Sequence, residues 1–139
     1  MMQNRYLLDL DKLDTLAKDI TATFKEGVVI LRGDLASGKT TLVKKVVKEL
    51  GVDDEVTSPT FSLQQCYGDS IFHYDIYNHG LEHFLSLGML EELEKEGIHF
   101  IEWGDEKLQE ILVSVGIDVM VIDIQKISAD EREYKICTL

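Results

Sequence analysis

The chain reads Gly33-Asp34-Leu35-Ala36-Ser37-Gly38-Lys39-Thr40 directly after an apolar run, Val28-Val29-Ile30-Leu31. The eight residues fit the phosphate-binding pattern G-x-x-x-x-G-K-[S/T] without a gap. The apolar run is typical of a strand buried on both faces, and residues 42–50 have the hydrophobic spacing of a helix. A buried strand before the pattern and a helix after it are the context that the pattern requires. The sequence therefore predicts a phosphate-binding loop.

The predicted loop has the chemistry of a triphosphate site. Successive backbone N–H groups in such a loop point at phosphate oxygens, and the following helix adds the positive end of its dipole. Gly33 and Gly38 stand where a side chain would block the turn or the approach of phosphate. Lys39 is expected to neutralise the β- and γ-phosphates, and the Thr40 hydroxyl to ligate Mg²⁺. The pattern predicts a nucleoside triphosphate with Mg²⁺ as ligand but does not fix the reaction.

The spacing of apolar residues predicts the elements around this loop. Early in the chain helices alternate with strands, whereas the middle and the end contain hairpins. This order predicts one α/β domain over residues 1–139, a P-loop NTPase-like fold of three layers with a mixed parallel and antiparallel sheet. Helices are predicted over residues 11–24, 42–50, 81–96 (interrupted at Gly88) and 106–113, and strands over residues 28–31, 61–67, 71–77, 98–103, 119–127 and 132–137.

Composition and charge exclude several classes of protein. The 139 residues include 14 Lys+Arg and 26 Asp+Glu, a net charge of −12. Such a surface repels phosphate backbones, so direct binding of nucleic acid is not expected. The longest apolar runs are too short to span a membrane, and the acids near the start of the chain do not suit a signal peptide. Cys66 and Cys137 are far apart and lack metal-binding spacing, so we expect reduced thiols in a cytoplasmic protein.

The charge is distributed unevenly along the chain. Residues 25–50, which include the loop, carry a net charge of +3, whereas residues 82–110 carry a net charge of −7. The acidic segment has two interpretations. It is either a solvated helix face or a docking surface for a basic partner.

Two carboxylates are candidates for metal binding and hydrolysis. Asp75 lies in the predicted strand 71–77, on the same face as His73 and Tyr77. A carboxylate within an apolar strand is costly unless it is paired or binds a metal. Glu102 ends another apolar run, the position at which P-loop proteins commonly carry an acid linked to Mg²⁺. Either residue is suited to ligate Mg²⁺ or to orient the attacking water, and the sequence leaves open which one contacts the ion. The alternative for Asp75 is a strand end exposed to solvent.

Two further features have open interpretations. Thr57-Ser58-Pro59-Thr60-Phe61 places hydroxyl residues around the only proline of the chain. The segment is either a fixed turn that senses the γ-phosphate or an ordinary loop into a strand. Trp103 is suited to pack on a nucleotide, to contact a partner or to fill the core.

Four segments together resemble a known family, the small bacterial P-loop ATPases required for threonylcarbamoyladenosine formation in tRNA (the TsaE family). The loop alone is unspecific, but its combination with the other three in this order is highly specific. The resemblance covers almost the whole chain. The segments are Gly33-Asp34-Leu35 through Gly38-Lys39-Thr40-Thr41, Thr57-Ser58-Pro59-Thr60-Phe61, His73-Tyr74-Asp75-Ile76-Tyr77 and Ile101-Glu102-Trp103.

The resemblance implies a cytoplasmic ATPase that uses ATP and Mg²⁺ within a protein complex. Its implied partners are the threonylcarbamoyl-transferase subunit and the inactive paralogue of that subunit. The protein would contact tRNA only through these partners. In isolation we expect a monomer with low ATPase activity. Carried over by position, Lys39, Asp75 and Glu102 would serve hydrolysis, and Thr40, Asp75 and Glu102 would serve the metal. The implied nucleotide-binding residues are Gly33, Asp34, Leu35, Ala36, Ser37, Gly38, Lys39, Thr40, Thr41 and Trp103.

The chain departs from the family pattern at two places. The family loop usually has Gly-Ala where this chain has Ala36-Ser37, so one permissive glycine is lost. The family strand usually ends Asp-x-Tyr-Arg, whereas Asn78 follows Tyr77 here. If the family arginine contacts phosphate or the partner, this chain must supply that contact differently.

Two alternative functions are considered beside the ATPase. A small-molecule P-loop kinase usually clamps phosphates with arginines from its acceptor site and lid. The chain has only Arg5, Arg32 and Arg132, which speaks against a kinase, although Arg32 adjoins the loop. The other alternative is a nucleotide-dependent assembly factor with negligible turnover, which would share the same ATP site.

Overall fold

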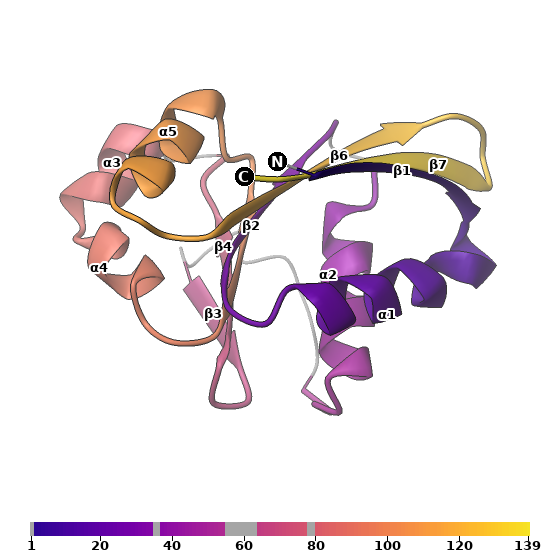
Figure 1. The fold of residues 1–139 in the computed structure, drawn as a ribbon, viewed down its shortest axis with the longest axis horizontal. Helices are drawn as coiled ribbons and strands as arrows, with labels where there is room; N and C mark the ends of the chain where they lie inside the picture. Colours follow the sequence, from indigo (N-terminus) through magenta and orange to yellow (C-terminus); the bar gives the residue numbers. More distant parts are fainter. Residues whose placement is uncertain (1, 35–36, 55–63, 78–79) are drawn as a thin grey trace.

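A seven-stranded sheet forms the centre of the molecule (Figure 1). The computed structural model describes residues 2–34, 37–54, 64–77 and 80–139. The sheet has the strand order β1-β7-β6-β2-β5-β4-β3, in which β6, β2, β5 and β4 run parallel. The pairs β1–β7, β7–β6 and β4–β3 are antiparallel, so the predicted mixed sheet is confirmed. The strands are β1 (Met2–Asp9), β2 (Gly27–Arg32), β3 (Gln64–Tyr67), β4 (Ile71–Asp75), β5 (Ile98–Glu102), β6 (Val119–Lys126) and β7 (Glu131–Thr138).

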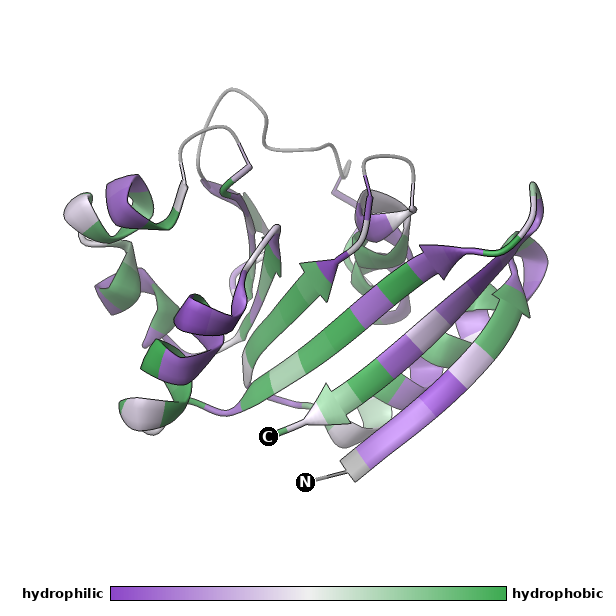
Figure 2. Ribbon diagram, turned by 90° about the horizontal axis from the view of Figure 1, so that it is seen from above, coloured by the Kyte–Doolittle hydropathy of each residue, from purple (hydrophilic) through white to green (hydrophobic). Residues whose placement is uncertain are grey.

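Helices cover both faces of the sheet and complete the three predicted layers (Figure 1). A short 3-10 helix (Leu10–Lys12), α1 (Leu13–Thr23) and α2 (Lys39–Glu49) pack on one face. The opposite face carries α3 (Gly80–Ser86), α4 (Met89–Leu93) and α5 (Glu106–Ser114). The strand β2 is apolar along nearly its whole length, as expected for a strand that helices cover on both sides (Figure 2). Among the described helices, none has the length and apolar character needed to cross a bilayer.

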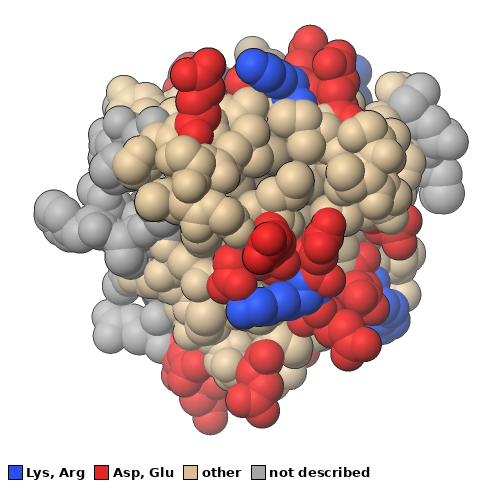
Figure 3. Space-filling model, turned by 90° about the vertical axis from the view of Figure 1, so that its left-hand side faces the viewer, with Lys and Arg blue, Asp and Glu red and all other residues tan. Residues whose placement is uncertain are grey.

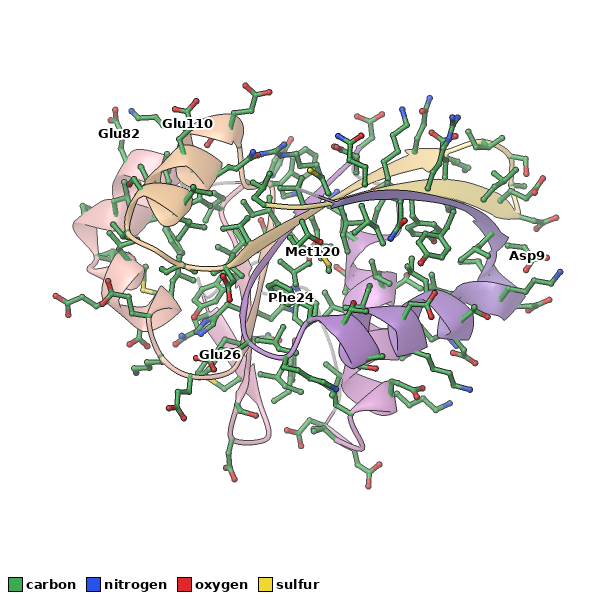
Figure 4. The ribbon with its side chains drawn as sticks, viewed as in Figure 1. Asp9, Phe24, Glu26, Glu82, Glu110 and Met120 are labelled. Atoms are coloured by element: carbon green, nitrogen blue, oxygen red, sulfur yellow. The ribbon has the colours of Figure 1, made fainter. Side chains whose placement is uncertain are left out.

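The two helical layers enclose separate hydrophobic cores. The first core lies between the sheet and the pair α1–α2, and its residues include Leu16, Leu42 and Phe100. Phe24 and Met120 also belong to it and point into the space between α1 and the sheet, whereas Glu82 and Glu110 project outward (Figure 4). The second core lies under α3, α4 and α5, and its residues include Tyr74, Phe84 and Leu108. Alternation along each strand sends successive side chains to different cores.

The structure corrects the predicted elements at four points. Residues 2–9 form β1, which was not predicted because three polar residues are followed there by three apolar ones, without the alternation that indicates a strand. The strand predicted to reach Tyr77 ends at Asp75, so Tyr77 lies in a turn and shares no strand face with His73. The helix predicted to reach Glu96 ends at Leu93. The helix predicted from residue 42 already begins at Lys39. Of the predicted strand 61–67, residues 61–63 lie outside the described part.

The parallel strands end at one edge of the sheet. The loop of residues 33–38 follows β2, Trp103 follows β5, and Ile76 follows β4. Ligands of open α/β sheets bind outside the carboxyl ends of such strands. The fold therefore brings together at this edge the segments that the sequence marked separately.

Candidate functional site

Two glycines determine how the loop turns between β2 and α2. Gly33 has a φ of 152°, and a Cβ built on it would lie 2.6 Å from the backbone oxygen of Ile124. Only a glycine therefore fits between β2 and β6 at this point. Gly38 has a left-handed φ of 103° and is the N-cap of α2. No heavy atom of the described residues lies within 4 Å of a Cβ built there, so the space at the start of α2 is open.

Lys39 is held on the loop by three contacts. Its Nζ donates hydrogen bonds to the carbonyl oxygens of Gly33 (2.8 Å) and Asp34 (2.9 Å). The same ammonium lies 4.0 Å from the centroid of the Trp103 ring, a cation–π contact. Burial lowers the pKa of Lys39, and the nearby carboxylates of Glu102, Asp75 and Asp34 act in the opposite direction. Lys39 thus places its ammonium next to the open start of α2.

Thr40 and Glu102 are in direct contact. Thr40 lies in the first turn of α2, and its Oγ1 donates a 2.9 Å hydrogen bond to Glu102 Oε2. Glu102 is the last residue of β5 and is almost fully buried. Asp75, the last residue of β4, pairs in register with Glu102, and its Oδ1 accepts a 2.9 Å hydrogen bond from the Tyr77 N–H. The three residues predicted to serve a metal therefore come together at the same edge.

Trp103 turns sharply at the end of β5. It has a φ of 70°, and no other non-glycine residue in the described ranges has a positive φ. Such a backbone is uncommon for a bulky side chain and is found in turns and at functional sites. The ring packs against Tyr77, with 4.6 Å between the centroids, and against the Lys39 ammonium. Trp103 also packs against the second core, so its half-buried ring contacts both that core and the loop.

Hollows flank the loop on two sides. One lies toward α5 and is lined by Arg32, Asp34, Trp103 and Asp105, among others. The other lies toward the end of β6 and is lined by Ser37, Gln125 and Lys126, among others. The Arg32 guanidinium donates to the Gly104 oxygen (2.9 Å) and to Gln109 Oε1 (2.8 Å). Arg32 thereby ties β2 to α5 at the rim of the first hollow.

Two residues of the site were missed by the sequence reasoning. The buried His73 lies on β4, and its Nε2 is 2.5 Å from Glu102 Oε2. The sequence placed it on the Asp75 face and within the third family segment, but it was assigned no role. Arg132 is the second residue of β7 and lies 95 positions after Ser37, and its Nε donates a 3.1 Å hydrogen bond to the Ser37 carbonyl oxygen. Only the strand topology could have brought it to the loop.

Other predicted site residues are less informative. Thr41 is exposed in the first turn of α2. Ser37 is buried, and within the described part of the chain its Oγ finds no hydrogen-bond partner. Leu35, Ala36, Asn78 and the segment Thr57–Phe61 lie outside the described residues.

Comparisons with known proteins agree with this fold. A family model described as threonylcarbamoyl adenosine biosynthesis protein TsaE matches residues 7–134. The chain is 38% identical over 99 residues to the tRNA threonylcarbamoyladenosine biosynthesis protein TsaE of Treponema pallidum, covering 67% of the chain and 73% of that relative. It is 32% identical over 127 residues to the protein of the same description from Bacillus subtilis, covering 88% and 77%. The crystal structure of Bacillus subtilis YdiB superposes with a TM-score of 0.73 at 27% identity, covering 97% of this chain and 84% of that one.

Proposed function

Because the chain belongs to the TsaE family of tRNA threonylcarbamoyladenosine biosynthesis proteins, we propose that it binds and hydrolyses ATP in support of this tRNA modification. The observation that carries the proposal is the contact between Thr40 and Glu102 beside the Lys39 ammonium. A hydroxyl in the first turn of the helix, a buried carboxylate and a lysine are the parts that P-loop enzymes use around the β- and γ-phosphates. Their convergence from α2 and β5 matches that arrangement.

The residues present also fit Mg²⁺. Thr40, Glu102 and Asp75 offer only oxygen atoms, which this ion prefers, and it commonly takes its remaining ligands from phosphate and water. In the described ranges no three His, Cys, Asp or Glu side chains gather closely enough to hold a metal without such help. When bound, the ion would draw charge from the phosphate oxygens. Lys39 and the N–H groups at the start of α2 would bind the phosphates, and Glu102 or Asp75 would orient the water.

The proposed partners are the threonylcarbamoyl-transferase subunit and its inactive paralogue. The side of the molecule formed by α3, α4 and α5 supports a protein partner with a basic surface. Acidic side chains gather on this side with few basic ones between them (Figure 3). Most acids of residues 82–110, among them Glu82, Glu94 and Glu110, are exposed. We propose that tRNA reaches this protein only through these partners, since like charges repel.

The binding step is tested by isothermal titration calorimetry with ATP and Mg²⁺. We expect Lys39→Ala to weaken ATP binding at least a hundredfold, since the cation of the loop is lost. Lys44→Ala is the matched control because Lys44 is an exposed lysine of the same helix. Equal binding by wild type and Lys39→Ala would contradict the proposed site.

The hydrolysis step is tested by ADP release, measured for the chain alone and with both proposed partners and tRNA. We expect slow turnover alone and faster turnover in the mixture. Glu102→Ala should keep most of the ATP binding and lose turnover, and unchanged turnover in this variant would defeat its assignment. Tight ATP binding with no ADP formed in any mixture would favour an assembly factor over an ATPase.

A further inference from the structure

We propose that His73 is a positioning residue that fixes the orientation of the Glu102 carboxylate. The inference rests on the proposed function, because it concerns how the hydrolytic residue is held. His73 lies on β4, the strand next to β5, and is fully buried on the face that α1 and α2 cover. Its Nε2–H donates to Glu102 Oε2 over 2.5 Å. Among the described residues its ring bonds to Tyr67 and Glu102 and to no residue of the loop, so it would act through Glu102.

The contacts of Glu102 show what His73 would achieve. Both hydrogen bonds of the carboxylate end on one oxygen, since Oε2 accepts from His73 and from Thr40 Oγ1. Among the described residues, no hydrogen bond reaches Oε1. Two donors on one oxygen fix the rotation of the carboxylate, so that the other oxygen is presented to water or to Mg²⁺. Partners in this position hold a carboxylate in its working geometry.

His73 is itself held from its other side. Its Nδ1 is 2.9 Å from the hydroxyl oxygen of Tyr67 on β3, and the same hydroxyl oxygen is 2.8 Å from Gln65 Oε1. With both ring nitrogens engaged, the imidazole is not free to turn. The hydrogen bonds thus form a continuous chain from the edge strand β3 through β4 and β5 to the first turn of α2. Its members in order are Gln65, Tyr67, His73, Glu102 and Thr40.

The molecule provides a matched control for this chain of contacts. On the other face of the sheet, the Tyr74 hydroxyl is 2.8 Å from His99 Nδ1, and both residues are fully buried. The other nitrogen of His99 donates to the backbone oxygen of Lys95 at 2.8 Å, not to a residue of the site. Tyr67→Phe and Tyr74→Phe each remove one buried tyrosine–histidine hydrogen bond of nearly the same length. Only the first change loosens a residue that touches Glu102.

The experiment measures kcat for ATP hydrolysis and the Kd for ATP in the assembled mixture with both partners. We expect His73→Leu to lower kcat 10- to 100-fold and to change the Kd less than threefold. His73→Gln, which keeps an N–H donor, should recover part of this loss. Tyr67→Phe should lower kcat three- to tenfold, whereas Tyr74→Phe should leave kcat within twofold of wild type. Thermal unfolding of all four variants confirms that each is folded at the assay temperature.

The outcomes separate this inference from the proposed function. If wild type hydrolyses ATP and Glu102→Ala does not, but His73→Leu and Tyr67→Phe keep full kcat, the positioning role is overturned and the ATPase stands. Equal losses in Tyr67→Phe and Tyr74→Phe would also overturn it, because they would show a general effect of stability. If His73→Leu does not fold, the comparison of the two tyrosine variants decides. Absence of turnover in wild type with its partners overturns both proposals.

Discussion

The sheet carries one buried tyrosine–histidine pair on each face, and the two pairs have different surroundings. Tyr67 and His73 lie on the face that α2 covers, and their hydrogen bonds lead to Glu102. Tyr74 and His99 lie toward α3, α4 and α5, and their hydrogen bonds lead to the carbonyl of Lys95. The His99 ring also stacks on Phe72, with 4.4 Å between the centroids.

The difference teaches that burial of a polar pair does not by itself indicate function. Both pairs satisfy the rule that buried polar atoms are hydrogen-bonded. What distinguishes them is the last group that each network reaches, a carboxylate at the carboxyl edge in one case and a backbone oxygen in the other. We therefore expect changes to groups that lead to the carboxyl edge to affect ATP binding or hydrolysis, and changes to the pair on the opposite face to affect stability alone.

The largest effect is expected from Gly33→Ala on the α2 face. The new Cβ would meet the Ile124 carbonyl oxygen at 2.6 Å, in addition to its unfavourable positive φ. We expect ATP binding to be lost and the free energy of unfolding to fall by more than about 3 kcal/mol. Gly116→Ala is the control, because Gly116 has a positive φ without a nearby atom and should cost only about 1 kcal/mol. Calorimetry and urea unfolding measure both quantities, and retained ATP binding would show that the loop tolerates a wider turn.

A tenfold loss of ATP affinity is expected from Arg132→Met. The guanidinium is almost fully buried and donates to the Ser37 carbonyl oxygen, which holds the loop next to β7. Losing this contact should weaken ATP binding by about 1.4 kcal/mol. Arg5→Met removes an exposed guanidinium on β1 and should not alter the Kd. Similar affinities in the two variants would mean that the loop holds its shape without β7.

A pH-dependent effect on stability is expected from the opposite face. Burial lowers the pKa of His99 below its ordinary value of 6.5, so the folded state keeps the ring neutral while the unfolded state takes up a proton. The unfolded state then binds more protons, and stability falls as the pH drops below about 6.5. Between pH 7.5 and 5.5, wild type should lose about 1 kcal/mol more stability than His99→Phe. Urea unfolding at both pH values measures this difference, and His83→Gln, which changes an exposed histidine, is the control. The His99→Phe variant should also bind ATP at pH 7.5 as wild type does. Equal losses in wild type and His99→Phe would assign the acid sensitivity to other groups.

The smallest effect is expected from Ser37→Ala on the α2 face. The buried Ser37 hydroxyl has no hydrogen-bond partner among the described residues, and an unsatisfied polar atom destabilises the folded state. Its removal should raise the free energy of unfolding by up to about 1 kcal/mol and leave the Kd for ATP within twofold. Ser114→Ala at the exposed end of α5 is the matched control. A large loss of ATP affinity in Ser37→Ala would show that the hydroxyl itself contacts the ligand.

Much of the fold was predictable because its central elements have strong local signals. The apolar run before Gly33, the helix behind it and the run ending at Glu102 appear close to their predicted bounds. The edge strand β1 was missed because its pairing with β7 depends on residues more than a hundred positions away. Tyr77 was predicted to lie in the strand, but it lies in a turn, because the alternation of residue types continues past Asp75, where β4 ends. Local periodicity cannot show where hydrogen-bond pairing stops.

The residues of the candidate site likewise divide into those that local sequence signals predict and those that they do not. Lys39, Thr40 and Glu102 follow from a contiguous pattern and from the end of an apolar run, and the structure brings them together. His73 and Arg132 contact Glu102 and Ser37, which lie far from them along the chain, and local sequence patterns cannot reveal such contacts. The ligands assigned to the site stay predictions that the binding and turnover measurements decide.

The pairing of β1 with β7 has a consequence for synthesis on the ribosome. The strand β1 (Met2–Asp9) cannot pair until β7 (Glu131–Thr138) has been synthesised, so this edge of the sheet forms last. Arg132 and the carbonyl of Ile124, which border the loop, arrive in the same late stretch. A nascent chain that already contains Lys39 and Glu102 would therefore not yet hold nucleotide tightly. If the proposed function holds, competence for ATP would arise only once β7 has been made.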